Sequence, residues 1–256
     1  MTAYDILQAC KRQRVSDGAT VPLLSDCAGA ERLLVLIWPQ LGDFDSLEYA
    51  WWLHREAEHL QGITLRAVGI GDRRSGQRFC DYTGFNPQHL FVDPSGDLHR
   101  QLELYPGLQV GLPGLNPAQQ AWLNLLLMCA GIGSPGTLAE VFRGYRGDRR
   151  APQLIADDEA VQAAPLPAIR GEFFRFAGGR GFQRPFELAT LRLRNMGEAL
   201  GHWGTYVPDA RRITQRGATF LFDGQGNLLY EHRDRGILGF AADMARPLSF
   251  LDQFRP

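Results

Sequence analysis

The chain has 256 residues, which is enough for one large domain with an extensive core. Its formal net charge of −1 gives no basic excess for nucleic acid and no acidic tail for a basic partner. The first 20 residues lack the apolar core of a signal peptide, and no stretch reaches the roughly 18 apolar residues that cross a bilayer. We therefore expect a cytoplasmic protein with no transmembrane segment.

The N-terminal half of the chain predicts a strand–helix–strand unit. Leu33–Trp38 is a short, continuous apolar run, which is typical of a buried strand in a parallel sheet. Apolar residues then recur at helical spacing over 45–62, where Asp45 and Glu48 have the pattern of a capping box. Ile63–Ile70 reads as a second strand. The two strands are expected to be parallel and joined by a right-handed crossover.

The rest of the chain predicts further helices and a hairpin near the end. Asn116–Ile132 is an apolar helix with Asn116 as its cap and Pro117 in its first turn. Ala218–Phe222 and Leu228–Glu231 flank a DGQGN turn and predict a β-hairpin. The other expected elements are a polar, helical lead-in over 1–20, a short strand over 90–92, and helices over 75–82, 97–104, 185–200 and 241–254.

Two stretches carry a family resemblance. The first has TGF, VDP and HR-x-L between 83 and 102, and the second has QRGATF and LYEHR between 215 and 233. Their order and spacing resemble the peroxiredoxin-like branch of the alkyl hydroperoxide reductase/thiol-specific antioxidant superfamily, over roughly 20–110 and 212–245. The resemblance implies an α/β, thioredoxin-like mixed sheet flanked by helices. We expect one domain over 1–256, with a mainly helical insertion over 112–211 before the final hairpin.

The usual redox cysteines are missing from the place where this family carries them. Redox-active relatives have Gly-Cys-x-x-Cys between the first strand and its helix, where the helix N-terminus stabilises a thiolate. Here the corresponding residues are Gly42, Asp43 and Ser46, with no sulfur. Asp43 and Ser46 can cap a helix but lack the nucleophilicity that peroxide reduction uses. We expect neither a metal site nor a cofactor.

Arg216 and Cys80 are the remaining candidates for chemistry. The resemblance places Arg216 where peroxiredoxins hold an arginine beside the thiolate. Without the sulfur, it either pairs with Asp43 or another carboxylate, or binds an anionic ligand or partner. Cys80 is the best surviving thiol, with Arg78 nearby to lower its pKa; the alternative is a cysteine packed in the core. Cys129, in an apolar helix, is expected to be a core residue.

The segment from Phe173 to Tyr206 combines arginine with aromatic residues, a composition enriched at protein interfaces. The alternatives are an amphipathic helix covering the sheet and an interfacial membrane site, which the lack of lysine disfavours. The partner-binding candidates are Arg175, Arg180, Arg184, Arg192, Arg194 and Trp203.

The sequence thus favours a non-catalytic, protein-binding or assembly factor. The whole sequence, including WPQLGDFDSLEYAWWL, also resembles proteins of cyanobacteria and plastids. That resemblance implies a partner in a photosynthetic membrane complex and a peripheral location on thylakoids. The alternative is a thiol-dependent peroxidase that uses a relocated cysteine such as Cys80, assisted by Arg216.

Overall fold

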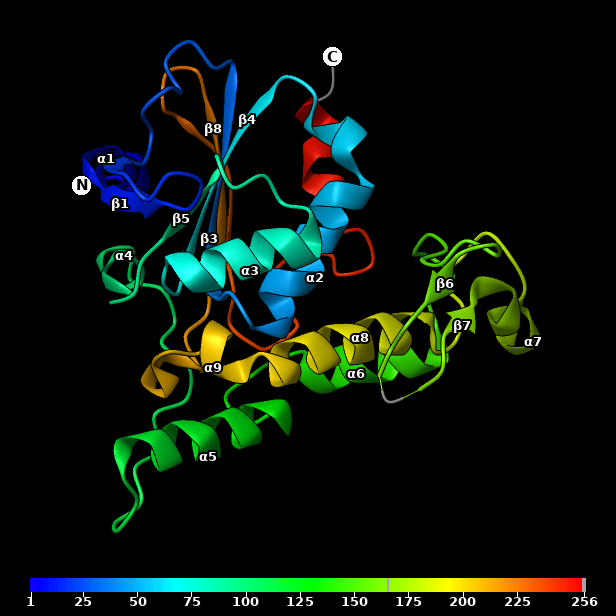
Figure 1. Cartoon of the computed structure of the whole chain (residues 1–256). Helices are drawn as coiled ribbons and strands as arrows, with labels where there is room; N and C mark the ends of the chain where they lie inside the picture. The colour runs from blue at the N-terminus through cyan, green and yellow to red at the C-terminus, as the bar shows by residue number, and fades with distance from the viewer. Residues whose placement is uncertain (165, 255–256) are drawn as a thin grey trace.

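The apolar run that begins at Leu33 forms the centre of a seven-stranded mixed sheet with the order β2-β1-β5-β4-β3-β8-β9 (Figure 1). The computed structural model describes residues 1–164 and 166–254; residue 165, within the expected insertion, and residues 255–256 lie outside the described part. The strands are β1 Lys11–Arg14, β2 Thr20–Pro22, β3 Arg32–Gln40, β4 Ile63–Ile70, β5 Leu90–Val92, β8 Ala218–Asp223 and β9 Leu228–Arg233.

Strand β3 separates two apolar cores because its side chains alternate between the two faces of the sheet. Leu34 and Leu36 belong to the core shared with helices α2 (Phe44–Arg55) and α3 (Arg73–Thr83). Val35 belongs to the opposite core, with residues of α1 (Ala3–Ala9) and α4 (Asp97–Gln101). Burial on both faces explains why the sequence of β3 is continuously apolar rather than alternating.

The pairing of the strands confirms the expected thioredoxin-like α/β fold. Strands β3 and β4, which precede and follow α2 along the chain, are parallel neighbours in the sheet, and β4 pairs in parallel with β5. Strand β8 is antiparallel to β3, and β9 completes the predicted hairpin. No helix in the described part of the chain is long and apolar enough to cross a membrane.

The helical segment 112–211 packs at one end of the sheet, below α2 and α3 (Figure 1). Its helices touch other helices, since α8 packs on α2 and α6, and α9 packs on α3. The alternative of an amphipathic helix covering the sheet is therefore met only in part, because Leu188 and Leu191 of α8 join the core that contains Leu34 and Leu36 of β3. A small lobe with the hairpin β6–β7 and the short helix α7 projects from the far end. The elements are α5 Pro117–Cys129, α6 Thr137–Arg146, β6 Ala160–Val161, β7 Ile169–Arg170, α7 Arg175–Gly178, α8 Glu187–Gly201 and α9 Trp203–Tyr206.

Several sequence predictions need correction. The lead-in over 1–20 contains strand β1 and the start of β2 as well as α1, and the C-terminal helix over 241–254 is only a 3-10 helix, Ser249–Phe254. Helix α6 was not predicted. Helix α2 is capped by Asp43 rather than Asp45. Helix α5 has the predicted cap, because Asn116 and Gln119 exchange side-chain-to-backbone hydrogen bonds. The remaining 3-10 helices are Ala57–Leu60, Gly171–Phe174 and Ala210–Arg212.

Candidate functional site

The position of the missing redox motif lies where β3 ends and α2 begins. Asp43 caps α2, accepting a hydrogen bond from the backbone N–H of Asp45 at 3.0 Å. Ser46 is fully buried, and its hydroxyl donates to the Gln40 carbonyl at 2.9 Å. Both residues at the expected cysteine positions therefore shape the start of the helix, and the Ser46 hydroxyl is engaged inside the protein.

Arg216 reaches this helix start from the segment that leads into β8. Its guanidinium is fully buried and donates to Asp43 at 2.6 Å and to Asp45 at 3.1 Å. It also donates to the carbonyls of Thr214 at 3.1 Å and Ile213 at 3.4 Å. The expected ion pair with Asp43 is thus present, with Asp45 as a second partner. An anion from solvent could reach this guanidinium only by displacing these groups.

Three carboxylates surround this one guanidinium. Asp45 also accepts from the backbone N–H of Leu238 at 2.7 Å, and Asp234 accepts from Gly217 at 3.1 Å. Burial raises the pKa of Asp45 well above its usual range, and the neighbouring Asp43 raises it further. Burial likewise raises the pKa of Asp234 to about 7. Both shifts favour the protonated acid, which carries no charge for the one arginine to balance.

The helical segment 112–211 closes over the start of α2. A cavity of only about 60 Å³ remains beside Asp43, and Cys129 of α5 and Trp203 of α9 help to line it. At Gly42 the chain passes so close to Tyr206 that an added Cβ would lie 2.5 Å from the Tyr206 Cβ. The place where relatives expose a thiol is here covered by apolar side chains.

Cys129 is the sulfur that the fold brings to this place. It is exposed, so the expectation that it is a core residue is wrong. Partial burial raises its thiol pKa, Asp43 raises it further, and Arg216 opposes both. Its position at the last residue of α5, the negative end of the helix dipole, also disfavours a thiolate. Nothing in the sequence around Cys129 signals this, because α2 and α5 meet only in the fold.

Cys80 is poorly placed for thiol chemistry. It is 6% exposed on α3, and burial raises its thiol pKa to about 12. The expected help from Arg78 is absent, because that guanidinium binds both oxygens of Glu198 at 2.7 Å. Cys80 thus lacks the activating neighbour that the sequence suggested, and its charged neighbour, Asp81, raises the thiol pKa further.

The partner-binding candidates fall into two groups. Arg184 is buried in ion pairs with Asp157 and Glu187, and Arg192 pairs with Glu48 at 2.7 Å. Arg184 is fully buried and closed to a partner, whereas Arg192 is ion-paired but still lines the groove between α6 and α8. The other four are exposed or partly exposed: Arg175, Arg180, Arg194 and Trp203. Arg175 and Arg180 both pair with Asp157. Trp203 stacks on Trp122, with 4.8 Å between the ring centroids.

Comparison with known proteins agrees with the family that the sequence resembles. Residues 52–236 match the family model described as AhpC/TSA antioxidant enzyme. The match spans more than half of the chain, which therefore belongs to the AhpC/TSA antioxidant family. It begins inside α2 and so leaves out Asp43 and Ser46. No curated protein matches the chain.

Replacing Arg216 should cost far more stability than replacing a surface arginine. We expect Arg216→Gln to lower the free energy of unfolding by roughly 3–5 kcal/mol, because it leaves the buried carboxylates of its partners without a positive charge. Arg211→Gln, which removes an exposed ion pair with Asp209, is the matched control and should cost at most about 1 kcal/mol. Urea unfolding at pH 7 measures both, and equal losses would contradict a structural role for the buried ion pairs.

Asp234 should make the protein less stable as the pH rises. Its pKa is higher in the folded chain, at about 7, than in the unfolded chain, so the folded state holds the proton more tightly. The resulting stabilisation is complete below about pH 4 and is lost as the pH rises through 7. Asp234→Asn should remove on the order of 4 kcal/mol of this pH dependence.

The measurement is a set of urea-unfolding curves between pH 4 and 8. Asp158→Asn, at an exposed position, controls for a general change in charge. A slope with pH that survives in Asp234→Asn would show that other groups cause it.

Proposed function

We propose that this chain is a non-catalytic member of its family that acts as a protein-binding or assembly factor. In this proposal, one thioredoxin-like domain carries the segment 112–211 as an insertion that provides the binding surface. The lack of a thiol at the start of α2 supports the non-catalytic part, because carboxylates occupy its place and Arg216 is already bound.

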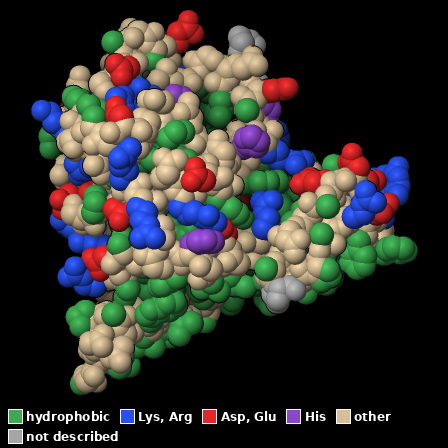
Figure 2. Space-filling view, in the orientation of Figure 1, with side chains coloured by type: hydrophobic (Ala, Val, Ile, Leu, Met, Phe, Trp, Pro, Cys, Tyr) green, Lys and Arg blue, Asp and Glu red, His purple; other side chains and the backbone are tan. Residues whose placement is uncertain are grey.

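The observation that carries the proposal is the concentration of exposed apolar side chains on this segment. Among the described residues, every large exposed hydrophobic side chain except Met1, Val110, Leu228 and Leu229 lies on this segment. Figure 2 shows apolar surface along the lower edge of the molecule, where Figure 1 places α5 and α6. Soluble proteins rarely expose large contiguous apolar patches without a partner for them.

The surface includes a groove between α6 and α8. Its volume is about 360 Å³, and its apolar lining includes Val141, Tyr145, Phe186 and Met196. The ion pairs of Arg192 lie inward, toward Glu48 and Glu140, so they neutralise charge beneath this groove. A folded partner could bury apolar side chains here without leaving a charge unpaired.

The resemblance to cyanobacterial and plastid proteins supports the setting of this function. We propose that the partner belongs to a photosynthetic membrane complex and that the chain associates with thylakoids peripherally, through that partner.

A pull-down with a tagged chain tests the binding function. Leu138 and Phe142 lie one turn apart on α6, with 47% and 53% of their surfaces exposed. The wild-type chain should capture a stoichiometric partner from solubilised membranes of its source organism. Leu138→Gln/Phe142→Gln should lose most of it, because the apolar contact is removed.

The matched control is Leu228→Gln/Leu229→Gln, which alters two exposed leucines on β9, outside the segment. This variant should capture the partner as the wild type does. Absence of any stoichiometric partner, or equal loss in both variants, would refute a role for the α6 surface.

The alternative function is a thiol-dependent peroxidase with a relocated cysteine, and one observation favours it. Cys129 is exposed and lines the cavity next to Asp43, so one sulfur does lie near Arg216. Against it stand the raised pKa of the Cys129 thiol and the carboxylates that already hold the guanidinium. Cys80 is weaker still, because its pKa is raised to about 12.

A peroxide-consumption assay separates the two functions. With thioredoxin or glutathione as reductant, we expect no turnover above the rate with no protein, because neither Cys80 nor Cys129 favours a thiolate at neutral pH. Cys80→Ala and Cys129→Ser should leave that result unchanged. Robust turnover that disappears in either variant would establish the enzyme and overturn the non-catalytic function.

A further inference from the structure

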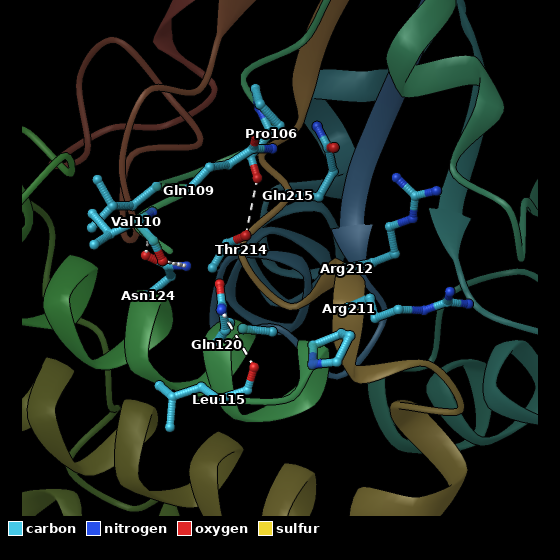
Figure 3. Close-up of a pocket in the computed structure, with 13 residues that line it drawn as sticks. Pro106, Gln109, Val110, Leu115, Gln120, Asn124, Arg211, Arg212, Thr214 and Gln215 are labelled. Atoms are coloured by element: carbon cyan, nitrogen blue, oxygen red, sulfur yellow. Dashed lines mark hydrogen bonds between the residues drawn. The ribbon is translucent and has the colours of Figure 1, made fainter. Parts of the chain in front are cut away.

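A second groove, separate from the apolar surface of α6 and α8, lies between the 106–115 loop, α5 and the residues before β8 (Figure 3). Its volume is about 410 Å³. The two arginines, Arg211 and Arg212, lie on one side of this view, and Val110 and Asn124 lie on the other. Both arginine side chains extend outward from the Gln120 and Asn124 amides in this view, so a ligand that spans the groove would meet the cationic groups at its outer end.

The lining is rich in primary amides that already bind backbone. Asn124 exchanges two hydrogen bonds with Val110, accepting at 2.9 Å and donating at 3.1 Å. Gln120 donates to the carbonyl of Leu112, and Gln215 donates to that of Tyr105. Because a primary amide both donates and accepts, these side chains match the donors and acceptors of a peptide group.

Part of this hydrogen-bonding capacity is unused. Within residues 1–164 and 166–254, the Oε1 atoms of Gln120 and Gln215 accept no hydrogen bond, and the Gln109 amide makes none. The Gln215 side chain belongs to a residue only 4% exposed, so its position is fixed by packing. The groove therefore offers fixed acceptors for N–H groups, with a donor at Gln109.

The arginine end of the groove carries an unbalanced positive charge. Arg211 binds Asp209 through Nε and Nη2. Arg212 is half-buried, and its guanidinium has no hydrogen bond or ion pair with any residue that the structure describes. Two guanidinium groups thus share one carboxylate, leaving Arg212 free for a bidentate contact with an incoming carboxylate.

We propose that this groove binds an extended peptide segment that ends in a free C-terminal carboxylate. The carboxylate pairs with Arg212, and peptide groups upstream of it bind the open amides of Gln215, Gln120 and Gln109. An apolar side chain further upstream lies against Val110 and Leu115, which also line the groove. The inference rests on the proposed binding function and gives it a class of partner.

Fluorescence anisotropy on the full chain tests the inference. The probes are an array of fluorescein-labelled heptapeptides with Leu, Ile, Val or Phe at varied positions, each made with a free carboxylate and as a C-terminal carboxamide. The best carboxylate peptide should bind at least tenfold more tightly than its carboxamide, because the charge-assisted contact is lost. N-acetylglycine, a carboxylate without the rest of the chain, should compete only at a far higher concentration.

Arg212→Gln should weaken the best peptide about tenfold while leaving thermal stability within the range of the wild type. Arg150→Gln is the matched control, since the Arg150 side chain is 84% exposed and is absent from this groove. It should leave affinity unchanged. The comparison of carboxylate with carboxamide needs no variant, so the test stands even where Arg212→Gln unfolds.

No binding by any array member, or equal affinity for carboxylate and carboxamide, would overturn the inference. Competition by N-acetylglycine as strong as by the peptide would also overturn it, and would assign the groove to small carboxylates. Capture of a membrane partner by a chain that binds no peptide leaves the proposed function standing. Peptide binding by a chain that captures no partner would support the groove as a peptide site and would refute the proposed function of the α6 surface.

Discussion

The buried guanidinium of Arg216 is the contact on which the arrangement of the site depends. It joins the segment before β8 to the first turn of α2 through Asp43 and Asp45. Asp45 in turn holds the backbone of Leu238, so a third stretch of the chain is fixed by the same group. Burying this charge is costly, and its two carboxylates are what make the burial tolerable.

The interaction that stabilises a thiolate at a helix N-terminus here stabilises the carboxylate of Asp43, which is ion-paired with Arg216. The N-terminus of a helix stabilises negative charge, whether thiolate or carboxylate. In this chain the charge belongs to Asp43, which caps α2 and binds Arg216. A helix N-terminus and a buried arginine thus meet at this position, and a carboxylate rather than a sulfur lies between them. The arginine joins distant parts of the fold through its ion pairs.

The sequence predicted the core of the fold and part of the site. The apolar run of β3, the helical spacing of α2 and the motif that placed Arg216 opposite Asp43 are local signals with clear physical causes. Cys129 was misjudged because burial depends on contacts between distant segments, and α5 brings this residue to Asp43. The pairing of Arg192 with Glu48 depends on such contacts too. No spacing rule along one helix reveals whether a charged side chain faces solvent or a buried partner.

The close approach of Gly42 to Tyr206 makes the change in this family member difficult to reverse. A cysteine returned to position 43 would lie beneath helices that leave room for little more than a few water molecules. Arg216 would still be bound to Asp45. An open thiol at the start of α2 would therefore require coordinated changes in the covering helices, the second carboxylate and the tyrosine contact.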